Sequence, residues 1–86
     1  MAKPLSTDEL LILLIEECSE VTQAATKCLR FGYTREWPGY GRNDARLSRE
    51  LGEVVALLRE LPLDEGEFQT GLAEKMSNVR KWRKTD

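Results

Sequence analysis

The feature that most constrains the fold of this chain is the spacing of apolar side chains between residues 7 and 31. These side chains recur every three or four positions, which is the repeat of one face of an α-helix. Ser6 followed by Glu9 forms a capping box that opens such a helix, and Gly32 is a typical residue just past its end. The apolar face comprises Leu11, Leu14, Ile15, Cys18, Val21, Ala25, Cys28 and Leu29. The pattern predicts a helix over residues 7–31.

Two later segments repeat the helical spacing. Asn43 is expected to cap the first of them, and Pro62 ends it because proline cannot continue a helix. Asp64 with Glu67 forms a cap pair for the second. The apolar stripes are Leu47, Leu51, Val54, Leu58 and Leu61 in the first segment and Phe68, Leu72, Met76, Val79 and Trp82 in the second. Residues 1–86 are therefore expected to form one all-α domain without strands, an antiparallel bundle of three main helices.

The segment "GYTREWPGYGRN", residues 32–43, separates the first two helices. Its glycines and proline predict an irregular loop, and it is longer than most connections in helical bundles. Trp37 is the first candidate in this loop to stack on a nucleobase, because aromatic faces bind bases. The alternative is that Trp37 closes the bundle or lies in a subunit interface.

The length of 86 residues limits the surface that a single chain can bury. We therefore expect a homodimer or a higher homo-oligomer. Hydrophobic residues make up 41% and charged residues 33%, which is typical of a globular protein. The longest apolar run, Leu10 to Ile15, is too short to cross a membrane and is not followed by a cleavage site. No membrane association is expected, and the expected location is the cytoplasm.

Charge and residue types exclude several kinds of site. The net charge of −2 argues against a nucleic-acid partner. A cluster of basic residues around Trp82 nevertheless leaves a small RNA or DNA binder as a third interpretation. This cluster consists of Arg80, Lys81, Arg83 and Lys84. The absence of histidine excludes an imidazole base, and the two cysteines, Cys18 and Cys28, are interpreted as core residues.

Acidic side chains interrupt the apolar face of the first helix in the stretch "EECSE". At about 100° per residue, Glu17 falls inside the apolar arc, Glu20 at its edge and Glu16 outside it. The second helix repeats the arrangement, with Glu50 inside its arc and Glu53 at the edge. Each helix thus offers a pair of carboxylates three residues apart, on one side of the helix.

Inward-facing carboxylates are unfavourable unless a cation compensates them. A divalent cation such as Mg²⁺, which prefers oxygen ligands, is one such cation. Lys75, which projects into the apolar arc of the third helix, could pair with the acids, contact a phosphate, or extend its charge from the core edge to water. Asn78, near it on the same helix, could bind phosphate or base, or be a plain polar edge residue. Both glutamate pairs could also lie on solvated faces.

The order "EECSE" then "ELGE" resembles the EExxE…ExxD signature of the MazG-like nucleotide pyrophosphohydrolases, part of the all-α NTP pyrophosphatase superfamily. The surrounding "LLIEECSEVTQAATKCLRFG" and "RLSRELGEVVALL" resemble the two motif helices of that family. The closing "KMSNVRKWRK" is similar to the last helix of its short, phage-type members. The resemblance runs from Leu10 to Lys84.

This resemblance implies a helical bundle completed by dimerisation or higher assembly. It also implies Mg²⁺-dependent hydrolysis of a nucleoside triphosphate (NTP or dNTP) to the monophosphate and pyrophosphate, with Mn²⁺ as a second candidate metal. The implied metal ligands are Glu17, Glu20, Glu50 and Glu53. The proton of the attacking water would pass to Glu16 or Glu20, between which the sequence does not choose.

One position departs from the family pattern. The family usually has Asp as its last acid, and this chain has Glu53, whose carboxylate reaches one methylene further. The departure keeps the charge and the oxygen ligand, but it could shift the site. It also slightly favours the alternative function, a non-catalytic MazG-like helical module for oligomerisation or binding.

Overall fold

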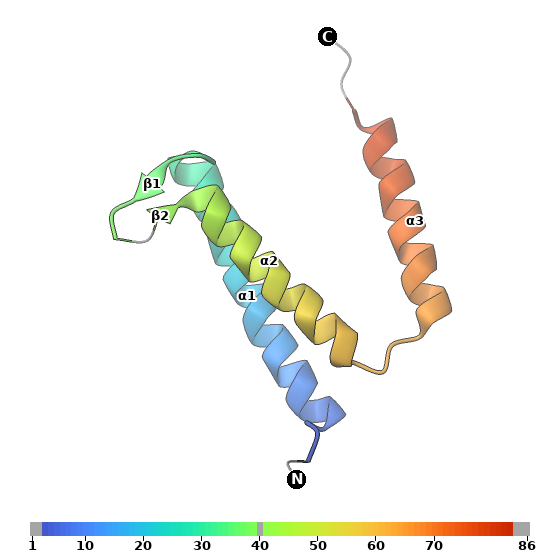
Figure 1. The fold of residues 1–86 in the computed structure, drawn as a ribbon. Helices are drawn as coiled ribbons and strands as arrows, with labels where there is room; N and C mark the ends of the chain where they lie inside the picture. The colour runs from blue at the N-terminus through green and yellow to red at the C-terminus, as the bar shows by residue number, and fades with distance from the viewer. Residues whose placement is uncertain (1–2, 40, 84–86) are drawn as a thin grey trace.

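The computed structural model describes residues 3–39 and 41–83, apart from the side chain of Trp37. Lys84, counted above with the basic residues, lies outside this range. Within it the chain consists of three helices, one short pair of strands, and the loop, connection and ends that join or flank them (Figure 1). The elements are α1 (Thr7–Phe31), β1 (Glu36–Trp37), β2 (Gly41–Arg42), α2 (Asn43–Glu60) and α3 (Glu65–Lys81). The prediction of an all-α chain is confirmed.

The ends of α1 and α3 follow from local side-chain chemistry. Ser6 Oγ accepts a hydrogen bond from the Glu9 amide at 3.1 Å, and Glu9 Oε1 accepts one from the Ser6 amide at 3.2 Å. This is the predicted capping box. Gly32 ends α1 with φ of 106°, which glycine adopts without strain. Asp64 caps α3 by accepting a hydrogen bond from the Glu67 amide at 3.0 Å.

The loop contains two short strands that the sequence pattern did not predict. β1 and β2 pair antiparallel, with Glu36 opposite Arg42. Gly39 and Gly41 have φ of 84° and 79°, so the chain can reverse within a few residues. Strands of two residues are too short to show an alternating pattern, which is why the sequence indicated only an irregular loop.

Asn43 does not cap α2, contrary to the prediction. The N-cap position belongs to Arg42, and Asn43 is the first residue of the helix. The Asn43 side chain is buried and donates a hydrogen bond from Nδ2 to the Gly32 carbonyl at 2.9 Å. Its backbone amide donates to the Arg35 carbonyl at 2.9 Å. Asn43 therefore ties the end of α1 to the start of α2.

Replacing Asn43 with alanine is expected to destabilise the fold by about 1–3 kcal/mol, because alanine removes the hydrogen bond that the buried Asn43 side chain donates to the Gly32 carbonyl. Urea unfolding followed by circular dichroism measures the change. Asn78→Ala, an exposed asparagine on α3, is the matched control and should change stability by less than about 0.5 kcal/mol. Equal stability of Asn43→Ala and the wild type would contradict this role.

α1 packs lengthwise against α2, and the residues at their shared seam are spaced alternately by three and four (Figure 1). The α1 seam residues are Leu10, Leu14, Glu17, Val21, Ala24 and Cys28, and those of α2 and its C-cap are Asn43, Leu47, Glu50, Val54, Leu57 and Leu61. All twelve are buried or half-buried. The seam is thus the core of the single chain, and two glutamates lie in it.

Several residues predicted to be core are exposed. Cys18 is the clearest correction, since it lies on an exposed side of α1, while Cys28 is half-buried at the seam. The other exposed members of the predicted faces of α1 and α2 are Leu11, Ile15, Leu29 and Leu51. They are exposed because the apolar arc of each helix is wide. α1 covers only one flank of the arc of α2, and α2 covers only one flank of the arc of α1.

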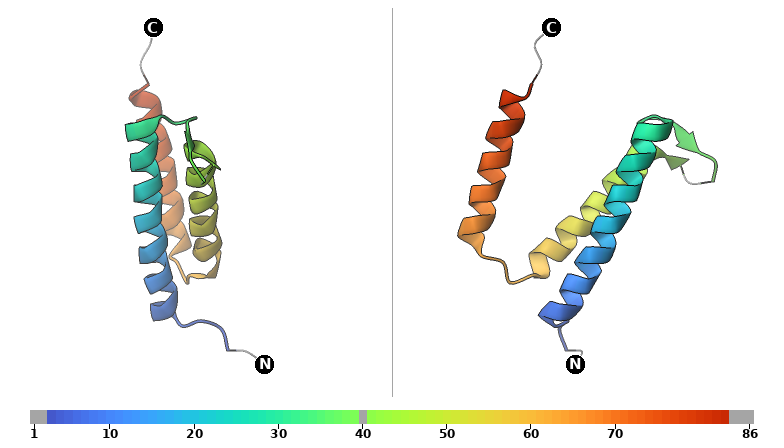
Figure 2. Two further views of the ribbon diagram at one scale, coloured as in Figure 1. Left: turned by 90° about the vertical axis from the view of Figure 1, so that its left-hand side faces the viewer. Right: turned by 180° about the vertical axis from the view of Figure 1, so that it is seen from behind.

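α3 stands apart from the pair formed by α1 and α2 (Figures 1 and 2). Every described residue from 62 to 83 is exposed, including the whole predicted apolar stripe of α3. The radius of gyration of 16.2 Å exceeds the value of about 12 Å for a compact chain of this length. A single chain therefore does not close a three-helix bundle. No helix of the described part has the length and apolarity of a membrane span.

Candidate metal centre

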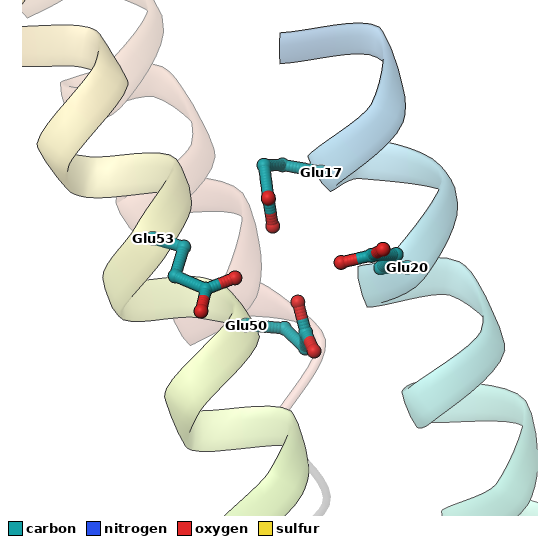
Figure 3. Close-up of side chains that lie close together, drawn as sticks. All are labelled: Glu17, Glu20, Glu50 and Glu53. Atoms are coloured by element: carbon teal, nitrogen blue, oxygen red, sulfur yellow. The ribbon is translucent and has the colours of Figure 1, made fainter. Parts of the chain in front are cut away.

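Four carboxylates from α1 and α2 converge at the middle of the seam (Figure 3). Glu17 and Glu20 project from α1, and Glu50 and Glu53 from α2. One ligand oxygen from each lies within 4.8 Å of those of the other three. We call these four residues the glutamate cluster.

Two members of the cluster are inner and two are at the rim, as the helical projection predicts. Glu50 is only 7% exposed and Glu17 is half-buried, because both occupy seam positions. Glu20 and Glu53, each three residues further along its helix, are exposed. The cluster is therefore held from the inside by the helix packing and opens to solvent at its rim.

The inner carboxylates, Glu17 and Glu50, each bury an oxygen whose charge no hydrogen-bond donor of the described residues compensates. Glu17 Oε2 and Glu50 Oε2 are buried and have no hydrogen-bond partner in the described part of the chain. Ionised carboxylates cannot donate to one another, so they can share a hydrogen bond only when one of them takes up a proton. A hydrogen bond shared with Glu53 is the main reason that the pKa of Glu17 rises from 4.5 to about 7. Burial, the negative charges of Glu53 and Glu20, and a hydrogen bond with Glu50 contribute the rest of this rise.

The donor chemistry of the cluster matches a divalent cation. The donor set is four carboxylate groups, which is the oxygen chemistry that Mg²⁺ and Mn²⁺ prefer. The two unpartnered buried oxygens would become ligands, and the exposed rim leaves room for water or a phosphate oxygen. The residues present therefore fit a metal ion of this class.

Glu53 reaches the cluster in spite of its extra methylene. Its ligand oxygen meets the same 4.8 Å limit as those of the other three acids. Because Glu53 starts from the exposed edge of α2, the longer side chain can fold back over the rim towards Glu17 (Figure 3). The departure from Asp at this position therefore leaves the number of converging carboxylates at four.

The remaining candidates lie elsewhere. Glu16 is exposed on α1 and is not a member of the glutamate cluster. Lys75 and Asn78 are exposed on α3, which stands apart from the cluster in the single chain. The Lys75 ammonium lies 5.4 Å from the centroid of the Trp82 ring, a cation–π contact. The backbone of Trp37 lies in β1, and its side chain is outside the described structure.

Sequence reasoning overlooked two arginines beside the cluster. Arg46 and Arg49 line a pocket that they share with Glu50. The signal was present in the sequence, because Arg46 precedes Glu50 by four residues and Arg49 precedes Glu53 by four. Residues at this spacing are neighbours on a helix surface.

Comparison of the chain with protein-family models, with curated proteins and with solved structures found no match.

Proposed function

We propose that this chain is a Mg²⁺-dependent nucleoside triphosphate pyrophosphohydrolase of the MazG-like type. The observation that carries the proposal is the convergence of four carboxylates, from the two motifs "EECSE" and "ELGE", on one point of the α1–α2 seam. Two of their oxygens are buried without a partner, which is unfavourable for a structural surface cluster but suits a metal site. Glutamates that served only solubility would lie on the solvated faces of the helices and not in the α1–α2 seam.

Each glutamate has a part in the proposed reaction. Glu17 and Glu50 would anchor the metal from within the seam, while Glu20 and Glu53 would complete its ligands from the rim. A bound Mg²⁺ supplies charge neutralisation and a position for water near the α-phosphorus of the substrate. Glu20 is the better candidate for the base, because it is both exposed and within the cluster. Glu16 is the second candidate, from outside the cluster.

Product analysis tests this proposal. Purified protein is incubated with each ribo- and deoxynucleoside triphosphate in the presence of Mg²⁺ or Mn²⁺, and pyrophosphate and orthophosphate are measured separately. The proposal predicts monophosphate and pyrophosphate in equal amounts with at least one nucleotide. Release of orthophosphate alone, or no hydrolysis of any nucleotide with either metal, would reject it.

A cytoplasmic location, where such nucleotides are available, belongs to the same proposal.

A homo-oligomer is the second part of the proposal. Its support is the exposed apolar stripe of α3, together with a radius of gyration that is large for a chain of this length. A second copy would cover this stripe and complete an antiparallel bundle, and it could bring Lys75, Asn78 and Trp37 of one copy nearer the cluster of another. The non-catalytic alternative, a helical oligomerisation or binding module, is favoured by the same stripe and differs in predicting no hydrolysis.

The double substitution Leu72→Glu, Met76→Glu is expected to convert the oligomer to a monomer, because it places charge in the α3 stripe. Light scattering coupled to size exclusion measures the mass. Ser77→Glu, an exposed position beside the stripe on the same helix, is the control and should keep the wild-type mass. A wild-type protein that is monomeric at working concentration would contradict this part of the proposal.

A further inference from the structure

A pocket of about 360 Å³ adjoins the glutamate cluster at the start of α2. It is lined by Gly41, Ala45, Arg46, Arg49 and Glu50. Glu50 lines the pocket and also belongs to the cluster, so the two share this residue. A ligand that spans both would meet carboxylates at one end and arginines at the other.

The charges along this side of α2 form two successive rows. Glu50 and Glu53 belong to the cluster, and Arg46 and Arg49 each lie four residues earlier, about 6 Å along the helix axis. Arg49 is exposed and forms no hydrogen bond or ion pair with the described residues. Arg46 is half-buried. Two arginines and one glutamate of the cluster thus line the same pocket.

This arrangement selects a particular ligand chemistry. The guanidinium of arginine presents donors in a planar fork that matches phosphate oxygens. The carboxylates repel a phosphate unless a cation lies between them, and the buried Glu50 oxygen without a partner provides for that cation. A metal-bound phosphate chain can bind the arginines through its phosphates and the glutamates through its metal ion. A simple anion would bind only the arginines, and a bare metal ion only the glutamates.

We propose that Arg46 and Arg49 form the subsite for the terminal phosphates of the metal-bound substrate, so that the pyrophosphate end lies in this pocket. The inference rests on the proposed function for its metal ion, and it adds the direction in which the substrate lies. The nucleoside end then points away from the start of α2. Pyrophosphate binds this subsite more tightly than a nucleoside monophosphate does, because only pyrophosphate presents two phosphates to the arginines.

Calorimetric titration with inorganic pyrophosphate at saturating Mn²⁺ tests the subsite without requiring turnover. Arg49→Gln is expected to weaken pyrophosphate binding about ten- to hundredfold, and Arg46→Gln by a similar factor. Arg49 is exposed, so its variant is expected to fold like the wild type. Arg59→Gln, an exposed arginine near the other end of α2, is the matched control and should bind pyrophosphate as the wild type does. All variants should bind Mn²⁺ alone with unchanged affinity.

The titration with Mn²⁺ alone separates failure of the subsite from failure of the proposed function. Equal pyrophosphate affinity in Arg49→Gln, Arg46→Gln and the wild type, with Mn²⁺ binding intact, would overturn the subsite and leave the metal site standing. Loss of pyrophosphate binding in Arg59→Gln to the same extent would also overturn it, because the effect would then be one of total charge. A wild-type protein that binds no Mn²⁺ would overturn the subsite together with the function on which it rests.

Discussion

Replacing Glu50 with glutamine is expected to lower pyrophosphate release by about 10²–10⁴-fold, which is the range for loss of several kcal/mol of transition-state stabilisation by a metal. Glu50 is the most buried of the four clustered acids, and its Oε2 has no partner in the described part of the chain. The amide has nearly the same shape but neither the charge nor the second carboxylate oxygen. The metal is therefore lost or misplaced while the seam is still filled.

Glu60→Gln is the control for this substitution, because Glu60 is an exposed acid on the same helix, outside the glutamate cluster. It should keep wild-type activity. Circular dichroism should show the same helix content in Glu50→Gln as in the wild type, which separates a lost site from a lost fold. Activity of Glu50→Gln within a few-fold of the wild type, in protein that hydrolyses nucleotides, would place the chemistry elsewhere.

The second large effect is expected in the pH dependence of stability. The folded-state pKa of Glu17, about 7, lies above its ordinary value of 4.5. A proton on Glu17 therefore favours the folded state. This contribution is fully present below about pH 4.5 and is lost as the pH rises through about 7. The metal-free protein should lose part of its thermal stability between about pH 5 and pH 8, and Glu17→Gln should lose less.

A divalent cation should reverse this loss. At about pH 8 Glu17 is ionised, whereas at about pH 5 the metal must displace a proton from it. A metal present at a hundredfold its Kd adds about 2.7 kcal/mol of stability, which raises the Tm of a small domain on the order of 10 °C. Thermal melts with and without Mg²⁺ at both pH values measure this. A rise that is equal at the two pH values, or equal in Glu17→Gln, would show that the stabilisation does not come from the cluster.

The sequence predicted the helices well because their ends depend on local chemistry. The capping box of Ser6 and Glu9 and the glycine at position 32 act within a few residues, and α1 begins and ends where they indicate. The four acids were also predictable, since each lies at a fixed angle on its helix. What the projection could not establish is that the two pairs face one another, which depends on the register of α1 against α2.

The core assignment was less accurate for a physical reason. The apolar arc of α1 is wide enough to serve two partners, and periodicity does not say which flank meets which partner. Cys18 and Leu51 belong to the predicted stripes but lie on flanks that the single chain leaves exposed. Asn43 is expected to be an N-cap because asparagine is frequent at helix starts. Its actual role, a buried hydrogen bond to Gly32, depends on a contact between residues eleven positions apart, which local patterns do not reveal.

The central claim is that the glutamate cluster binds a divalent metal ion, and titration of Mn²⁺ followed by electron paramagnetic resonance tests it most directly. The signal of free Mn²⁺ falls as the ion binds, whatever the substrate or the reaction. We expect saturable binding to the wild-type protein, competition by Mg²⁺, and loss of that binding in both Glu17→Gln and Glu50→Gln. Absence of binding to the wild type at millimolar Mn²⁺, or binding that both substitutions leave unchanged, would contradict the claim.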